Sequence, residues 1–285
     1  MIMYADDAQF LDAALPQNMS DLQNRVEQNL AIAHDWFSQN SLKINPIKTE
    51  MILIKSRRLA TNAHFSITFD GKRIKPAQSV RILGVIVDSC LSWEPHISSV
   101  VRRCYGILIG LARMRYRLPP ETKRLLIEAL IFPHVRYCLS VWGSCTAAQR
   151  YRVQKAVNFA ARMVSGAGYG DRMTPVLRNL KWLKVEDMIC KQDVLLMREL
   201  LTATRAPELL RNEVVRRSDV SGRVTRASSD ALQLQILRVR TEFTRRCFRS
   251  RACGAWNHLP SNVRASATSS TSVFKSALDS YLLRR

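Results

Sequence analysis

The sequence contains no long apolar run. None of its apolar segments approaches the ~18 residues that a membrane-spanning helix requires, and its first residues include two acids where a signal peptide would have basic residues and an apolar core. The seven cysteines are odd in number and include no CxxC pair, which disfavours a disulfide framework. We therefore expect a soluble intracellular protein, nuclear or cytoplasmic, with reduced thiols and no membrane partner.

Zinc-binding spacing is missing as well. Cys247 and Cys253 have His258 nearby, but their spacing matches neither a zinc finger nor a zinc knuckle. Buried or surface thiols are therefore favoured over a metal site at this place. The five histidines are isolated from one another along the chain, which favours structural roles for them.

Acidic residues are scarce relative to basic ones. The chain has 44 lysines and arginines against 23 acids, which gives a formal net charge of +21. Residues 1–90 are nearly balanced, with 10 basic and 9 acidic side chains, whereas residues 91–285 carry 34 basic and 14 acidic ones. This uneven excess indicates a polyanionic partner such as nucleic acid. The apolar content of 47% is sufficient for a packed core.

The first third of the chain has the pattern of short strands around one helix. Ser20–Gln23 matches a capping box, and apolar residues at helical spacing follow it as far as Asn40. Residues 51–54 predict a sheet strand. Residues 65–74 predict a hairpin that turns at Asp70–Gly71. Together these elements predict a compact α+β unit.

Further along, the pattern changes from strands to helices. Residues 80–88 predict one more strand, and helical spacing begins after Trp93. Pro119–Pro120 is expected to start a helix at its first turn, and Pro133 to end or kink it. The other expected segments are helices over 97–117, 149–164 and 185–202, a loop over 265–272, and a final helix after that loop.

Two adjacent carboxylates lie in the opening apolar segment. Asp6 and Asp7 follow Tyr4-Ala5 at a point where a tight turn would fall between two extended runs. Burial of a carboxylate pair costs several kcal/mol unless a cation compensates. The pair is therefore either a solvated turn or a metal-binding site. In a straight strand the two side chains would point to opposite faces, so they can share a site only at a hairpin tip.

The order of several motifs resembles one family. YADD is followed by the capped helix, NPIKTE, ILGVIVDSCLSWEPHI, LIFPHVRYCLSVWG, NLKWLKVED and AWNHLPSNVR. This series resembles the reverse transcriptases of non-LTR retrotransposons, of the Jockey-like LINE type, over nearly the whole chain. The resemblance implies an α+β fold with part of a polymerase palm and its primer-grip hairpin over 1–95, a thumb over 96–148, and a basic helical region over 149–285.

The resemblance also implies a reaction and its partners. The activity would be that of an RNA-directed DNA polymerase, a nucleotidyltransferase that uses an RNA template, a DNA primer and a dNTP. Two Mg²⁺ ions would be held by Asp6 as the first ligand and Asp7 as the second. Tyr4 would lie beside them near the primer end.

Further residues receive roles from the same resemblance. Lys48 would assist the departure of pyrophosphate as a general acid or electrostatic stabiliser, although a solvated strand-entry lysine is slightly favoured. Leu83–Gly84 would form the primer-grip hairpin, where glycine allows a close backbone approach; a bulge glycine is the alternative. Trp93, His96, Trp142 and Trp182 are expected in the core. The thumb residues expected to bind the RNA:DNA duplex are Arg102, Arg103, Arg113, Arg115 and Arg117.

The family pattern also contains parts that this sequence does not carry. An upstream catalytic aspartate and the fingers precede the hairpin in the family, so we expect a fragment that binds RNA and DNA but does not extend a primer by itself. Two other classes stay open. One is a non-catalytic basic nucleic-acid-binding protein derived from the polymerase, and the other is a helical scaffold whose charge only keeps it in solution.

Overall fold

The chain forms two compact units in the computed structural model. Unit 1 is Met1–Pro95 and unit 2 is His96–Arg285. The structure describes residues 2–56, 65–114, 116–202, 206–220, 232–236 and 238–285. Strands occur in unit 1 and long helices in unit 2, so the expected α+β class is confirmed at that level. None of the described helices is both long enough and apolar enough to cross a bilayer.

The described residues of unit 1 form four separate two-stranded ribbons instead of one shared sheet. Three ribbons are antiparallel hairpins, and the fourth joins β3 and β6 in parallel over two residues each. The strand expected over 51–54 is therefore shorter than predicted. The ribbons are β1 (Ile2–Tyr4) with β2 (Asp7–Gln9), β4 (Ile67–Phe69) with β5 (Lys72–Ile74), β7 (Ser79–Ile82) with β8 (Val85–Asp88), and β3 (Met51–Ile52) with β6 (Pro76–Ala77).

Two of the hairpins turn on a pair of residues that both have positive φ. Asp70 and Gly71 have φ of +48° and +69°, which is the pattern of a type I′ turn. The hairpin predicted there is confirmed. Leu83 and Gly84 show the same pattern, with φ of +45° and +84°. The prediction of a single strand over 80–88 is therefore wrong, because the continuous apolar run concealed a turn at Leu83–Gly84.

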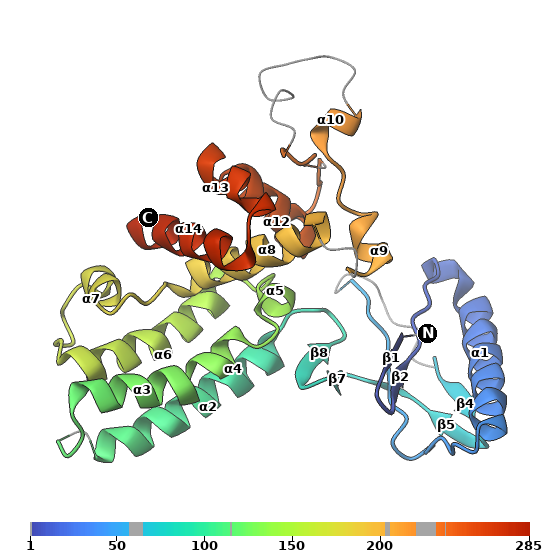
Figure 1. The fold of residues 1–285 in the computed structure, drawn as a ribbon. Helices are drawn as coiled ribbons and strands as arrows, with labels where there is room; N and C mark the ends of the chain where they lie inside the picture. The colour runs from blue at the N-terminus through green and yellow to red at the C-terminus, as the bar shows by residue number, and fades with distance from the viewer. Residues whose placement is uncertain (1, 57–64, 115, 203–205, 221–231, 237) are drawn as a thin grey trace. The chain divides into compact units, whose positions relative to one another are not determined.

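Helix α1 (Met19–Gln39) packs against the β4–β5 hairpin, as Figure 1 shows. Leu30 is buried in one cluster with Phe69 and Ile74. The helix follows a 3₁₀ turn, η1 (Pro16–Asn18), so that Asn18 occupies the N-cap position. The predicted capping box at Ser20 is therefore wrong, because the chain is already helical at Ser20 and its side chain lies beyond the cap.

Unit 2 is helical from α2 onward. Helix α2 starts at Glu94, at the end of unit 1, and the expected helix over 185–202 is confirmed as α8. The larger helices are α2 (Glu94–Arg113), α3 (Pro120–Leu130), α6 (Ala147–Ser165), α7 (Met173–Asn179), α8 (Val185–Thr202), α12 (Phe248–Asn257) and α14 (Thr271–Arg284). The short ones are α4 (Phe132–Arg136), α5 (Leu139–Trp142), α9 (Glu208–Arg211), α10 (Arg217–Val220), α11 (Glu242–Arg246), α13 (Ser261–Ala265) and η2 (Ser266–Thr268).

Local signals account for several helix boundaries in unit 2. Pro119 is the N-cap of α3 and Pro120 lies in its first turn, as predicted. Helix α3 ends at Leu130, before Pro133, and Pro133 lies in the first turn of the next helix, α4. Helix α6 begins before the predicted residue because the side chains of Thr146 and Gln149 form a capping box. The loop predicted over 265–272 is partly wrong, because its first half is the 3₁₀ turn η2.

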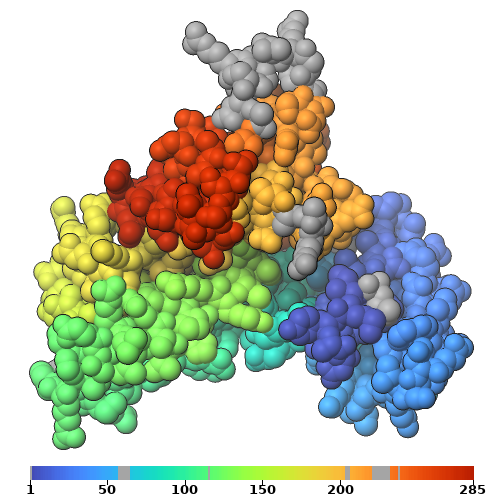
Figure 2. All heavy atoms as spheres, viewed as in Figure 1, coloured from blue at the N-terminus to red at the C-terminus, as the bar shows by residue number. Residues whose placement is uncertain are grey.

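The centre of unit 2 is the contact of α8 with the C-terminal helices. Figures 1 and 2 show α12 and α14 lying on α8, where Met197 packs with the buried Trp256 and Phe274. A buried ion pair joins the same helices: the guanidinium of Arg251 donates to both carboxylate oxygens of Asp193. Its Nη2 also donates to the Ser140 carbonyl at 2.8 Å, so the pair links α12, α8 and α5.

Candidate nucleic-acid interface

The β1–β2 hairpin presents the adjacent carboxylates at its tip. Tyr4 pairs with Asp7 across the ribbon, which leaves Ala5 and Asp6 as a two-residue loop. The turn therefore falls one residue earlier than expected, and Asp7 opens β2. Ala5 has φ of +51°, a conformation that is unfavourable for alanine. All four side chains are exposed.

This hairpin can offer oxygen ligands to a cation. Both carboxylates are exposed on one tip, and carboxylate oxygens are the ligands that hard cations prefer. Across the part of the chain that the structure describes, no cluster of three or more His, Cys, Asp or Glu residues is placed to hold a metal ion. The metal role of Asp6 and Asp7 stays a prediction.

Lys48 lies in an exposed turn ahead of β3. The Asn45 side chain accepts a hydrogen bond from the Ile47 amide at 2.9 Å, and its carbonyl accepts from the Lys48 amide at 3.1 Å. The Asn45-Pro46 pair thus supplies the turn chemistry of this segment. The Lys48 side chain is exposed, which is compatible with both predicted roles.

The Leu83–Gly84 segment forms a hairpin tip, as the resemblance implied. The Leu83 side chain is 41% exposed although leucine is apolar. Gly84 has a φ of +84° that only glycine adopts without strain. A tip of this shape exposes backbone groups to an approaching strand, and its role as a primer grip stays a prediction.

Asp88 is a structural residue that sequence reasoning missed. Its carboxylate accepts hydrogen bonds from the backbone amides of Ser92 at 2.9 Å, Trp93 at 2.8 Å and Cys90 at 3.2 Å. The hydrogen bonds fold the segment after β8 into a tight loop in which Leu91 and Trp93 both have positive φ. An Asp at a strand end followed by a short polar loop and a helix is the signal that could have indicated it.

Helix α2 exposes one basic face. Arg102, Arg103 and Arg113 are exposed on it, whereas Cys104 and Leu108 are buried on the opposite side. Arg117 is exposed just beyond the helix. Arg115 lies outside the described residues.

Two glycines interrupt this exposed face of α2. Gly106 and Gly110 are four residues apart, and a Cβ atom added at either would meet no heavy atom within 4 Å. Glycine within a helix costs about 0.5–1 kcal/mol relative to alanine. Since packing inside the described chain does not require these glycines, the face is open for close approach from outside.

The residues expected in the core are buried. The exposed fractions are 6% for Trp93, 5% for His96, 0% for Trp142 and 5% for Trp182. The indole Nε1 of Trp182 donates to Glu128 at 2.8 Å, and the indole Nε1 of Trp142 donates to the Tyr137 carbonyl at 2.9 Å.

All seven cysteines are free thiols. Burial raises the pKa of the Cys104, Cys145 and Cys190 thiols to about 11. His258, which lies near Cys253 in the sequence, has its Nδ1 atom 2.6 Å from the Gly254 carbonyl oxygen.

Comparison with known proteins finds relatives among retrotransposon polymerases. The chain is 26% identical over 191 residues to the Drosophila melanogaster protein named "Probable RNA-directed DNA polymerase from transposon BS". It is 23% identical over 194 residues to the RNA-directed DNA polymerase from mobile element jockey of the same fly. It is 24% identical over 190 residues to the retrovirus-related Pol polyprotein from the type-1 retrotransposable element R1 of Bradysia coprophila.

These alignments cover most of this chain but a small part of each relative. They include 66%, 65% and 64% of the chain and 21%, 20% and 19% of the three relatives. The chain thus spans about a fifth of the length of these three curated relatives. No family model matches the chain, and no solved structure does.

Proposed function

The chain shares a jockey-like reverse transcriptase region with the polymerases of non-LTR retrotransposons, and on this basis we propose that it contributes two parts of an RNA-directed DNA polymerase. The first is the carboxylate hairpin β1–β2 on the palm side. The second is the basic face of α2, which acts as a thumb surface for the RNA:DNA duplex. The observation that carries the proposal is the exposed pair Asp6 and Asp7 at one hairpin tip.

In the proposed reaction, the hairpin residues have separate roles. Asp6 and Asp7 would hold Mg²⁺, an ion that proteins commonly bind through one or two carboxylates together with substrate phosphates. Mg²⁺ held there would supply electrostatic stabilisation for nucleotidyl transfer. Tyr4 lies across the ribbon from Asp7 and flanks the primer end. Lys48 contributes positive charge for the leaving pyrophosphate of the dNTP.

Cation binding at the hairpin can be tested with Mn²⁺ as a paramagnetic probe. Mn²⁺ should broaden the NMR amide resonances of Tyr4 and Ala8 in the full chain, and excess Mg²⁺ should reverse the effect. The double variant Asp6→Asn/Asp7→Asn should abolish the broadening. Both side chains are exposed, so the fold should persist. Asp35→Asn, on the exposed face of α1, is the matched control. Equal broadening in the double variant would contradict the metal role.

The duplex-binding proposal for α2 rests on charge and on shape together. Arg102, Arg103 and Arg113 supply cations, and Gly106 and Gly110 remove the side chains between them. A sugar–phosphate backbone can then approach the helix closely between two arginine-bearing turns. Phosphate contacts of this kind provide affinity without sequence information and weaken steeply with salt.

Replacement of the two α2 glycines should affect stability and binding in opposite directions. Gly106→Ala/Gly110→Ala should raise the free energy of unfolding by about 0.5–1 kcal/mol per site, because the added methyl groups meet nothing in the described chain. The same variant should weaken binding of an RNA:DNA duplex, measured by fluorescence anisotropy. The matched control is Gly254→Ala in α12, where the added Cβ also meets nothing. Equal affinities for the variant and the control would refute the proposed contact.

Catalysis by this chain alone is not part of the proposal. Adjacent carboxylates on one hairpin supply only one wall of a two-metal site, and the chain aligns with about a fifth of each relative. We therefore expect nucleic-acid binding without primer extension. Robust extension of a primer by the isolated chain with Mg²⁺ would contradict this.

A second candidate function is favoured by the α2 face. A non-catalytic nucleic-acid-binding protein derived from the polymerase would use Arg102, Arg103 and the two glycines but not the hairpin. In that case Asp6→Asn/Asp7→Asn would leave every measured property unchanged.

A further inference from the structure

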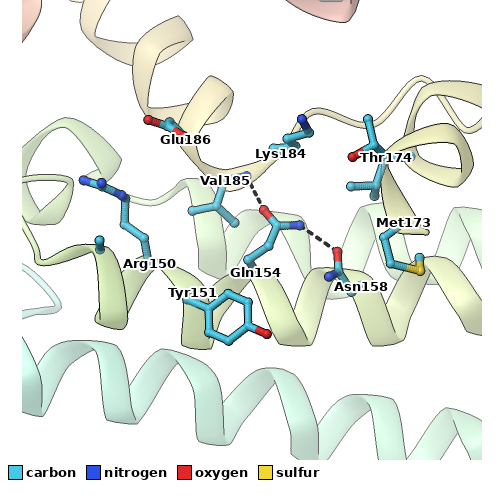
Figure 3. Close-up of a pocket in the computed structure, with 11 residues that line it drawn as sticks. Arg150, Tyr151, Gln154, Asn158, Met173, Thr174, Lys184, Val185 and Glu186 are labelled. Carbon is cyan, nitrogen blue, oxygen red and sulfur yellow. Dashed lines mark hydrogen bonds between the residues drawn. The ribbon is translucent and has the colours of Figure 1, made fainter. Parts of the chain in front are cut away.

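An open cavity of about 300 Å³ lies in unit 2 between α6, α7 and the start of α8. This volume is at the lower end of the range for small-molecule sites, about 300–1,000 Å³. Figure 3 shows that the lining side chains come from all three helices. The polar and aromatic side chains that line it include Arg150, Tyr151, Gln154, Asn158, Lys184 and Glu186.

The floor of the cavity is a row of oriented amides. The backbone amide of Val185 donates to Gln154 Oε1 at 2.7 Å, which fixes the oxygen of this side chain toward α8. Gln154 Nε2 must then be the group that donates to Asn158 Oδ1, also at 2.7 Å. Asn158 therefore has its oxygen occupied and its NH₂ group left to donate. Figure 3 shows this row of hydrogen bonds along α6.

An aromatic ring lies next to this amide row. Tyr151 is 58% exposed, and the Lys155 ammonium lies 4.8 Å from the ring centroid over one face. A flat ligand could stack on the other face of the ring. Leu177, which is buried, adds an apolar wall to the cavity.

The polar groups around the cavity are mostly donors. Arg150 and Lys184 bring two cations, and Asn158 offers its NH₂ group, whereas Glu186 is the one carboxylate among the residues that line it. A fitting ligand therefore needs a flat ring, several hydrogen-bond acceptors and negative charge. A nucleotide has all three features, whereas an acidic peptide would leave the aromatic face unused.

We propose that this cavity binds one unstacked nucleotide of a single-stranded nucleic acid. The base stacks on Tyr151, a carbonyl of the base accepts from Asn158 Nδ2, and the phosphate lies against Arg150 and Lys184. This site adds a single-strand contact to the proposed duplex contact on α2. It does not depend on the carboxylate hairpin.

The test uses the full chain and labelled oligouridine RNA, with oligothymidine DNA as a second arm that distinguishes the two sugars. Anisotropy titrations are run at near-physiological salt. Tyr151→Ala should weaken single-strand binding by about tenfold, since one base–aromatic stack contributes about 1–3 kcal/mol and 1.4 kcal/mol corresponds to tenfold. Asn158→Asp, which replaces the donor by a charged acceptor, should also weaken it.

Matched controls separate the cavity from general effects of the substitutions. Tyr169 is 94% exposed and has the Arg162 guanidinium 5.4 Å from its ring centroid, but it does not line the cavity. Tyr169→Ala should therefore leave the affinity unchanged. Asn179→Asp adds the same charge outside the cavity and should also have little effect. All four variants should keep the far-UV circular dichroism spectrum of the unaltered chain, which shows that they fold.

Three outcomes would overturn the proposal. The first is unchanged affinity in Tyr151→Ala and Asn158→Asp. The second is an equal loss in the variants and their controls. The third is equal competition by polyglutamate and by oligouridine, because the cavity would then be a general anion site. If the unaltered chain does not bind the RNA:DNA duplex but Tyr151→Ala and Asn158→Asp still weaken single-strand binding, the proposed role of α2 is refuted and the cavity proposal stands.

Discussion

Asp88 should control the stability of the segment between the β7–β8 hairpin and α2. The residue is 8% exposed and accepts backbone hydrogen bonds from Cys90, Ser92 and Trp93. Within the same loop, Leu91 and Trp93 have φ of +48° and +65°. A positive φ costs about 1–2 kcal/mol at each residue other than glycine. The carboxylate therefore holds a loop that backbone preference opposes.

The expected effect follows from these contacts. The hydrogen bonds from Ser92 and Trp93 are short, at 2.9 and 2.8 Å, and bonds to a charged acceptor contribute about 1.5–3 kcal/mol each. Their loss in Asp88→Ala is partly offset by the release of ~1–2 kcal/mol of strain at one residue. We expect the free energy of unfolding to fall by about 2–4 kcal/mol. Asp88→Asn keeps one acceptor oxygen, so it should lower the free energy of unfolding by less.

The assay combines two measurements. Urea unfolding followed by far-UV circular dichroism gives the free energy of unfolding, and hydrogen exchange by mass spectrometry over residues 88–97 reports the loop itself. Exchange in that peptide should be faster in Asp88→Ala. The control Asp35→Asn removes a carboxylate on the exposed side of α1 and should change the free energy by less than about 0.5 kcal/mol.

The effect should also depend on pH. Burial by itself would raise the pKa of Asp88, but hydrogen bonds from Ser92, Trp93 and Cys90 outweigh it and hold the pKa below its usual value. A lowered pKa in the folded state means that the stabilisation is complete above the unfolded pKa, ~3.9, and is lost as the pH falls through the folded value. The unaltered chain should therefore exceed Asp88→Asn in free energy of unfolding by the full amount at pH 6, and this difference should shrink below about pH 4. A difference that stays constant down to pH 2, or an Asp88→Ala variant as stable as the control, would refute the reasoning.

Three further predictions concern unit 2. Gly143→Ala should lower the thermal midpoint, in contrast to the α2 glycines, because the added Cβ would lie 2.5 Å from a backbone carbonyl oxygen; an unchanged midpoint in a thermal melt would contradict this. Arg251→Met should lower the free energy of unfolding in urea by about 3–5 kcal/mol, because it leaves the fully buried Asp193 carboxylate unpaired. The added change Asp193→Leu should recover part of that loss, and a double variant less stable than the single one would count against the explanation. At pH 8, iodoacetamide should alkylate Cys104 and Cys145 far more slowly than the same residues in urea, because burial raises each thiol pKa to about 11 and limits access; mass spectrometry showing equal rates would disprove it.

Local sequence signals predicted much of the secondary structure. Asp70–Gly71 predicted a turn because both residues tolerate positive φ, and the helix over 185–202 followed from its apolar period. Ser20 was misleading because the helix already begins at Met19, after a 3₁₀ turn, so that Asn18 and not Ser20 occupies the N-cap position. The turn at Leu83–Gly84 was hidden because leucine rarely adopts positive φ, and the resemblance to the family indicated it where local pattern did not.

The sequence by itself determined the net charge, the helices with clear apolar periods, the adjacent carboxylates and the family resemblance, since each is a property of residues close together in the chain. Tertiary structure alone decided the parallel pairing of β3 with β6, the Arg251–Asp193 pair across 58 positions, and the cavity whose floor joins Gln154 to Val185. Such contacts form between residues that lie far apart in the chain. Their energy depends on how distant elements pack, so no local pattern encodes them.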